Sequence, residues 1–125
     1  MSPAGRSIVV FGIYVSAIGI GFFFAPNIIL PILGLPLSAD FWVRITGIVA
    51  CVIGYYYLVS ARAELTTFFR ASTYARTGVC VAVLLLVLTN SAPFALLPLG
   101  IIDLIGAAWT HFALRQAAKS SVSAA

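Results

Sequence analysis

Charged residues are scarce in this sequence. Asp, Glu, Lys and Arg make up 8% of its 125 residues, while 62% are hydrophobic. Soluble domains usually carry about 25% charged residues, so this composition cannot supply a water-facing surface. Nor is there a polar domain on which cations cluster as in nucleic-acid-binding proteins. We therefore expect a single transmembrane domain over residues 1–125, with membrane lipids and no nucleic acid among its partners.

Metal ligands and redox groups are few as well. Cys51 and Cys80 stand alone in apolar runs, which argues against a C-x-x-C redox pair of the vitamin K epoxide reductase kind. One histidine, three acids and two separated cysteines do not provide the close ligands that a metal needs. The common phosphate, dinucleotide, hydrolase and metalloprotease motifs are also missing. We expect no metal and no cofactor.

The long apolar runs are typical of helices. Runs such as 45–59 and 79–88 do not alternate between apolar and polar residues as membrane barrel strands do. Each spanning helix needs about 20 apolar residues. The sequence predicts an all-α, integral membrane four-helix bundle. Its spans are expected near residues 7–25, 41–61, 74–89 and 94–114, followed by a disordered tail at about 117–125.

The first span has two interpretations, because Arg6 precedes it as in a signal peptide. Its apolar run exceeds the 7–15 residues usual for a signal peptide and lacks an A-x-A-like end, which favours a retained helix. Gly12, Ser16 and Gly19 give this helix a face of small residues. Such faces let helix backbones approach closely, so this face is a candidate contact surface for a second copy of the chain or for another membrane protein.

The connections carry further predictions. Segment 28–37 is interrupted by two prolines and a glycine, which favours an interfacial loop over a re-entrant segment. Ser38 or Asp40 is expected to cap the second span. Segment 62–70 places its large apolar side chains on one helical face, so a short amphipathic helix in the interface is predicted there.

The basic residues predict the orientation. Six of the seven fall on one side of a four-span topology, and only Arg44 falls near the other. The positive-inside rule then places both termini in the cytoplasm and the protein in the bacterial inner membrane. Anionic lipid headgroups are the expected partners of the cytoplasmic arginines. These candidate headgroup-binding residues are Arg62, Arg70, Arg76 and Arg115.

Asp103 is the sharpest functional feature, because it stands inside the apolar stretch 98–109. A charge at the bilayer centre costs about 2.5–3.5 kcal/mol or more and usually has a partner or a function. We expect Arg44 to be that partner, since the Cα depths of the two residues differ by only about 5–10 Å. Alternatively, Arg44 pairs with Asp40 at i, i+4 and Asp103 is protonated.

The expected site is a polar seam between the second and fourth spans. Arg44 and Tyr55 lie on one helical face, and Asp103, Thr110 and His111 lie on or beside another. These five residues are the candidate ligand-binding set. Asp103, His111 and Arg44 are also the candidates for catalysis, with His111 suited to proton transfer. In the alternative interpretation, the seam only holds the helices together and His111 anchors a helix end in the interface.

Several short motifs between residues 7 and 115 carry a resemblance to a known family. They are Gly12-x-Tyr14, Ala25-Pro26-Asn27, Leu33-Gly34-Leu35-Pro36, Asp40-x-Trp42-x-Arg44-x-x-Gly47, Gly54-Tyr55-Tyr56-Tyr57 and Asp103-x-x-Gly106-x-x-Trp109-Thr110. With them the chain resembles small, largely uncharacterised bacterial four-span proteins of the DoxX-like or domain-of-unknown-function kind. The resemblance implies a four-helix bundle and no settled activity. The chain is also similar in size to small multidrug exporters, whose first span carries a functional glutamate; segment 7–25 contains no acid.

Two functions follow from this reading of the sequence. The favoured one is a non-catalytic protein that binds a membrane partner or a lipid-like hydrophobic molecule. The alternative is a membrane-embedded enzyme or small transporter that uses the seam around Asp103. Whether the protein is an enzyme stays open at this point.

Overall fold

All the regular secondary structure in the described part of the chain is helical. A computed structural model describes residues 1–37 and 41–124, and these ranges contain no strand. Four of the helical segments are long and apolar enough to cross a membrane. The predicted all-α fold with four candidate spans is thus confirmed. The elements are α1 (Pro3–Phe24), α2 (Pro26–Ile32), α3 (Phe41–Arg62), α4 (Thr66–Leu88), the 3₁₀ turn η1 (Phe94–Leu96) and α5 (Leu97–Ala124).

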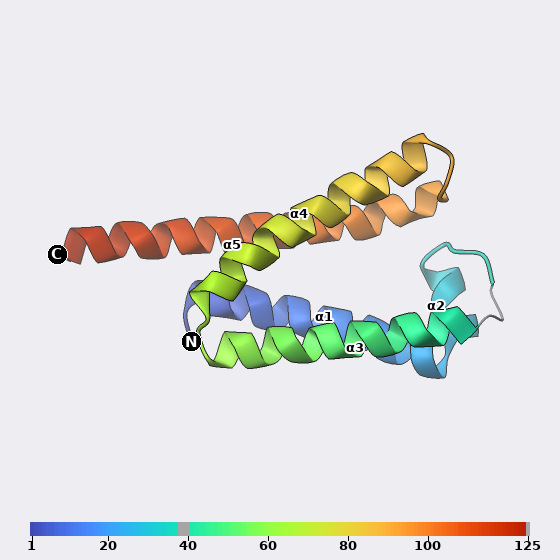
Figure 1. The fold of residues 1–125 in the computed structure, drawn as a ribbon, viewed down its shortest axis with the longest axis horizontal. Coiled ribbons are helices and arrows are strands. Elements are labelled where there is room, and N and C mark those ends of the chain that lie inside the picture. Colours follow the sequence, from blue (N-terminus) through green and yellow to red (C-terminus); the bar gives the residue numbers. More distant parts are fainter. Residues whose placement is uncertain (38–40, 125) are drawn as a thin grey trace.

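The long helices form two antiparallel pairs. Helix α1 packs on α3, and α4 packs on α5, while α1 also touches α5. The pairs meet near the N-terminus and the turn between α3 and α4, which we call the closed end (Figure 1). They diverge toward α2 and η1, which we call the open end (Figure 1). The bundle is therefore a wedge and not four parallel helices at equal spacing.

Glycines bring α1 and α3 into backbone contact. A Cβ atom on Gly19 would lie 2.7 Å from the carbonyl oxygen of Gly47. One on Gly54 would lie 2.9 Å from the carbonyl oxygen of Gly12. No side chain fits at that separation, so only glycine permits it. The small-residue face predicted on the first span is thus occupied by α3 of the same chain.

The closed end holds the core of the bundle. Ile8, Ala61 and Phe69 have no exposed surface, and they cluster with Tyr57 and Ala113. Because Phe69 is needed in this core, residues 66–70 form the first turns of α4. The predicted amphipathic interfacial helix over 62–70 is therefore wrong, and the third span begins at residue 66 and not near 74.

Glu64 ties the turn between α3 and α4 to the start of α1. Its carboxylate accepts hydrogen bonds from the Ser2 hydroxyl at 2.6 Å and the Ser2 backbone N–H at 2.9 Å. The Ser2 Oγ in turn accepts from the Gly5 N–H and caps α1. The hydroxyl and backbone bonds from Ser2 hold the pKa of Glu64 below its ordinary value. An acid here also complements the positive end of the α1 dipole.

Two other predicted features differ from the structure. Segment 28–37 begins within helix α2, which ends in a glycine cap: Gly34 has φ +71° and Leu35 N–H donates to the Leu30 carbonyl oxygen. This pattern is the Schellman motif, which needs a residue with positive φ. Helix α5 continues to Ala124, because the expected tail after 117 is rich in Ala and other helix-compatible residues. The predicted cap at 38 or 40 lies outside the described residues.

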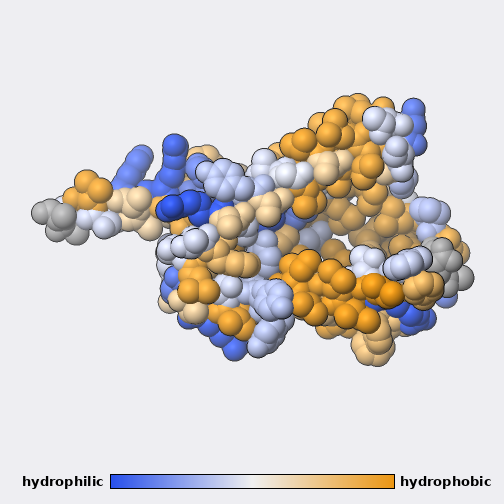
Figure 2. All heavy atoms as spheres, in the orientation of Figure 1, coloured by the Kyte–Doolittle hydropathy of each residue, from blue (hydrophilic) through white to orange (hydrophobic). Residues whose placement is uncertain are grey.

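Large apolar side chains cover the outside of the bundle. Ile20, Val52, Leu84 and Ile105 are all exposed. Figure 2 shows hydrophobic surface on both helical pairs and on the sides that flank the hollow between them. This surface is what a lipid environment requires, because lipid tails are as apolar as the side chains they meet.

Candidate functional site

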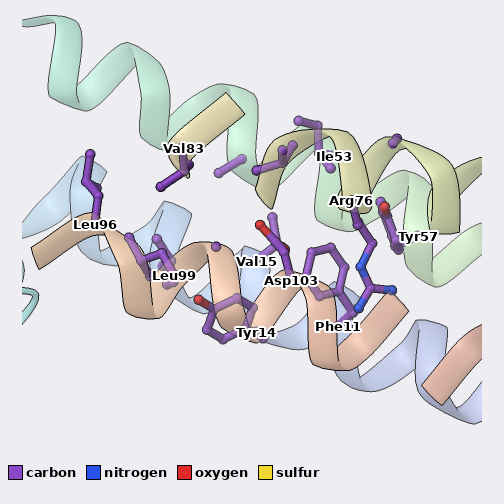
Figure 3. A pocket seen from close by; sticks show the side chains of 15 residues that line it. Phe11, Tyr14, Val15, Ile53, Tyr57, Arg76, Val83, Leu96, Leu99 and Asp103 are labelled. Carbon is purple, nitrogen blue, oxygen red and sulfur yellow. The ribbon is translucent and has the colours of Figure 1, made fainter. Parts of the chain in front are cut away.

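The divergence of the two helical pairs leaves a cavity of about 470 Å³. All four long helices and η1 contribute to its walls, which are mostly aliphatic and aromatic. Its polar groups are few and come from all four long helices: Tyr14 of α1, Tyr57 of α3, Arg76 of α4 and Asp103 of α5 (Figure 3). An apolar cavity with a few convergent polar groups is the usual form of a binding site.

Arg76 is the most unusual residue in this cavity. Helix α4 carries it, and only 3% of its surface is exposed. Its guanidinium carbon lies 3.7 Å from the centroid of the Phe11 ring, a cation–π contact. Yet Nε, Nη1 and Nη2 all lack a hydrogen-bond partner within the described part of the chain. Arg76 therefore brings a buried set of up to five unused N–H donors to the cavity wall.

Gly106 makes room for that guanidinium. A Cβ atom at this position of α5 would overlap Arg76 Nη2. Gly106 lies one helical turn after Asp103, so the same face of α5 supplies the space for the cation and an acid. Helix α5 thus accommodates Arg76 because Gly106 has no side chain, and not because α5 offers a hydrogen bond.

Asp103 faces the same cavity and is only partly exposed. Figure 3 shows its carboxylate and the Arg76 guanidinium with the Phe11 ring between them. A carboxyl group between spans was predicted, and Asp103 fits that prediction. The predicted partner, however, is wrong: the cation that shares its cavity is Arg76 and not Arg44.

Arg44 has a structural position at the open end. Its Nη1 donates to the backbone carbonyl oxygen of Phe23. Helix α1 ends at Phe24, so that carbonyl has no partner within the helix. Arg44 is exposed and caps α1. The alternative pair between Arg44 and Asp40 lies outside the described residues.

The other predicted seam residues lie apart from the cavity. Tyr55 is 62% exposed on the outer face of α3. Thr110 is fully buried and hydrogen-bonds Ser7 of α1 at 2.7 Å, which joins α5 to α1. His111 is exposed beside the ring of Phe112. The seam is not assembled because α1 packs against both α3 and α5, and its glycine contacts occupy the face of α3 that was expected to meet α5.

The cations predicted to bind headgroups divide into two groups. Arg62, Arg70 and Arg115 are exposed near the closed end, and their contact with lipid headgroups stays a prediction. Arg76 is buried in the bundle and belongs to the cavity instead. The feature that distinguishes Arg76 from the other three cations is its depth: it lies ten residues, or about 15 Å along the helix, from the start of α4.

The arrangement is suited to binding more than to bond making. Among the described residues no three potential ligands come close enough to hold a metal. Cys51 donates weakly to the Ser16 carbonyl oxygen at 3.8 Å. Arg76 can hold acceptor atoms, and Asp103 can accept or donate a hydrogen bond.

No protein-family model, curated protein or solved structure matches this chain. The resemblance to DoxX-like proteins therefore stays a prediction.

Proposed function

We propose that this multi-pass membrane protein binds a lipid-like, amphiphilic molecule in the cavity between its two helical pairs. The apolar part of that molecule would lie against the aliphatic walls, with its polar end at Arg76 and Asp103. The observation that carries the proposal is the guanidinium of Arg76, which is buried without a hydrogen-bond partner in the described part of the chain. An unsatisfied buried donor costs about 1–3 kcal/mol, and more if it is charged. A ligand with acceptor oxygens would remove this cost.

The cavity limits the chemistry of the ligand. Its volume of about 470 Å³ suits a small molecule and not a protein segment, since ligand cavities span about 300–1,000 Å³. Arg76 needs an acceptor, and Asp103 favours a donor nearby. A membrane-soluble molecule with oxygen atoms at one end meets both requirements.

The proposed location follows from the basic residues. We place both termini in the cytoplasm of a bacterium and the helices in its inner membrane, as the positive-inside rule indicates. The open end of the wedge would then face the outer leaflet. Labelling of Ser91→Cys in whole cells tests this topology: a reagent that cannot cross the membrane should label it from outside, and labelling from the cytoplasm alone would contradict the orientation.

Binding can be measured with the fluorescent fatty acid cis-parinaric acid. We expect saturable binding to the purified protein, and Arg76→Gln should weaken it about 10–100-fold, because a charge-assisted hydrogen bond contributes about 1.5–3 kcal/mol. The control Arg62→Gln removes an exposed arginine and should leave the affinity unchanged. Equal affinities for the two variants, or binding that does not saturate, would refute the proposal.

Transport or catalysis at Asp103 stays the alternative, supported by the position of this acid on the cavity wall. Asp103→Asn tests the role of the carboxyl group. If the folded variant keeps its thermal stability, the carboxyl group faces a ligand and does not hold the helices together. If the variant fails to insert or unfolds, packing is its role.

A further inference from the structure

Two grooves lie on the exposed side of α4 and α5, apart from the cavity. The groove nearer the closed end has a volume of about 210 Å³, and its basic side chains are Arg70, His111 and Arg115. The next groove has a volume of about 330 Å³ and is lined by apolar side chains such as Leu104, Ala108 and Phe112. We call them the basic groove and the apolar groove.

The two grooves adjoin each other. Both are lined by Thr73, Tyr74 and His111. Along α5 they extend from Ala118 to Leu104, which corresponds to about 21 Å of helix. Cations thus lie at one end of the adjoining grooves, and hydrocarbon side chains lie at the other.

The charge of the basic groove is not neutralised by the described residues. No acid among the residues that the structure describes lines either groove. Glu64 is hydrogen-bonded to Ser2, and Asp103 lines the cavity on the other side of α5. Figure 2 shows hydrophilic side chains over the C-terminal part of α5. An anion from outside the chain is therefore the complementary partner.

We propose that these grooves form a specific site for one anionic phospholipid. Its phosphate lies between Arg70 and Arg115, and one acyl chain follows the apolar groove past Ala108. A basic pocket between spanning helices is a common form of headgroup site, and the apolar continuation distinguishes a lipid from a free phosphate ion. This site is separate from the cavity and does not depend on what the cavity binds.

Native mass spectrometry of the delipidated protein tests the proposal. Dioleoylphosphatidylglycerol should be retained more strongly than dioleoylphosphatidylcholine, which has the same chains without the net charge. The double variant Arg70→Gln/Arg115→Gln should lower retention of the anionic lipid about tenfold or more. Arg6→Gln/Arg62→Gln removes two exposed arginines at the same end and should change it little.

Four results would overturn the proposal. One is equal loss of the anionic lipid in the two double variants. Another is equal retention of the two lipids by the natural sequence. The third is displacement of the lipid by millimolar inorganic phosphate, which would identify a free anion as the occupant. Ala108→Trp fills the apolar groove without altering a charge; retention should fall in this variant too, and unchanged retention would also refute the site.

Discussion

Replacing Arg76 with methionine should stabilise the empty protein and abolish ligand binding. Methionine has a similar length and fills the same space without donors or charge. The free energy of unfolding should rise, because the buried guanidinium has no hydrogen-bond partner among the described residues. Groups that bind ligands are often retained at a cost in stability of this kind.

The size of the effect follows from opposing contributions. Removing an unsatisfied buried donor recovers about 1–3 kcal/mol, and more if it is charged. Losing the contact between Arg76 and Phe11 costs about 0.5–2 kcal/mol. Replacing a buried ion pair by apolar side chains of similar volume is neutral or stabilising by up to about 4 kcal/mol in other proteins. We expect a net increase of about 1–2 kcal/mol for Arg76→Met.

Unfolding in mixed micelles with increasing SDS measures this change. The control Arg62→Met replaces an exposed arginine and should stay within about 0.5 kcal/mol of the natural sequence. Because Asp103 loses the nearby cation, Arg76→Met/Asp103→Asn should be at least as stable as the single variant. A loss of more than about 1 kcal/mol in both Arg76 variants would refute the reasoning, because Arg76 would then be held by the fold and not kept for a ligand.

The remaining predictions concern three other positions. Gly19→Val should weaken the bundle by several kcal/mol in the same SDS assay, since a Cβ atom there meets the α3 backbone; Gly78→Val is the control, with nothing within 4 Å. Gly106→Ala should weaken binding of cis-parinaric acid by displacing the guanidinium. Gly78→Ala, whose Cβ would have nothing within 4 Å, should bind normally and be up to about 1 kcal/mol more stable. The Glu64 pKa is lowered on folding, so its contribution is present above the unfolded value of 4.5 and is lost as pH falls through the folded value. Melting curves should show this acid-dependent loss, and Glu64→Gln should remove it.

The number of long helices was predictable, because a membrane requires each apolar span to be helical. A span must satisfy its own backbone, so long apolar runs leave little choice but helices. The ends of helices were less predictable, because packing decides them. Residues 66–70 read as an interfacial helix by their amphipathic pattern, but Phe69 belongs to a core that forms only when α1, α3 and α5 are in place. Nothing in that segment alone contains this information.

The site was predicted in part, for a related reason. Asp103 could be recognised as a site residue from the sequence, because an acid in an apolar run is costly wherever the helix lies. Its companion was missed because identifying Arg76 requires the true start of α4 and the helix that α5 faces. Gly106 marked the place where the guanidinium fits, but a glycine in a span has many possible explanations. The contact between Arg76 and Phe11 joins distant parts of the chain and appears only in the fold.

The uneven distribution of small residues explains why a cavity exists at all. Helices α1 and α3 touch through their backbones at two levels, so this pair is closely packed along its length. Between the two pairs, the buried core lies at the closed end, where Phe69 fills it and Thr110 bonds Ser7. At the open end, the segment after α2 reaches η1: a Cβ atom on Gly34 would lie 3.0 Å from the Cβ of Ala95. Between these two contacts, residues of all four long helices line the cavity and do not fill it, so the space must be filled by lipid tails or by a ligand. Only a ligand with acceptor atoms would also satisfy Arg76.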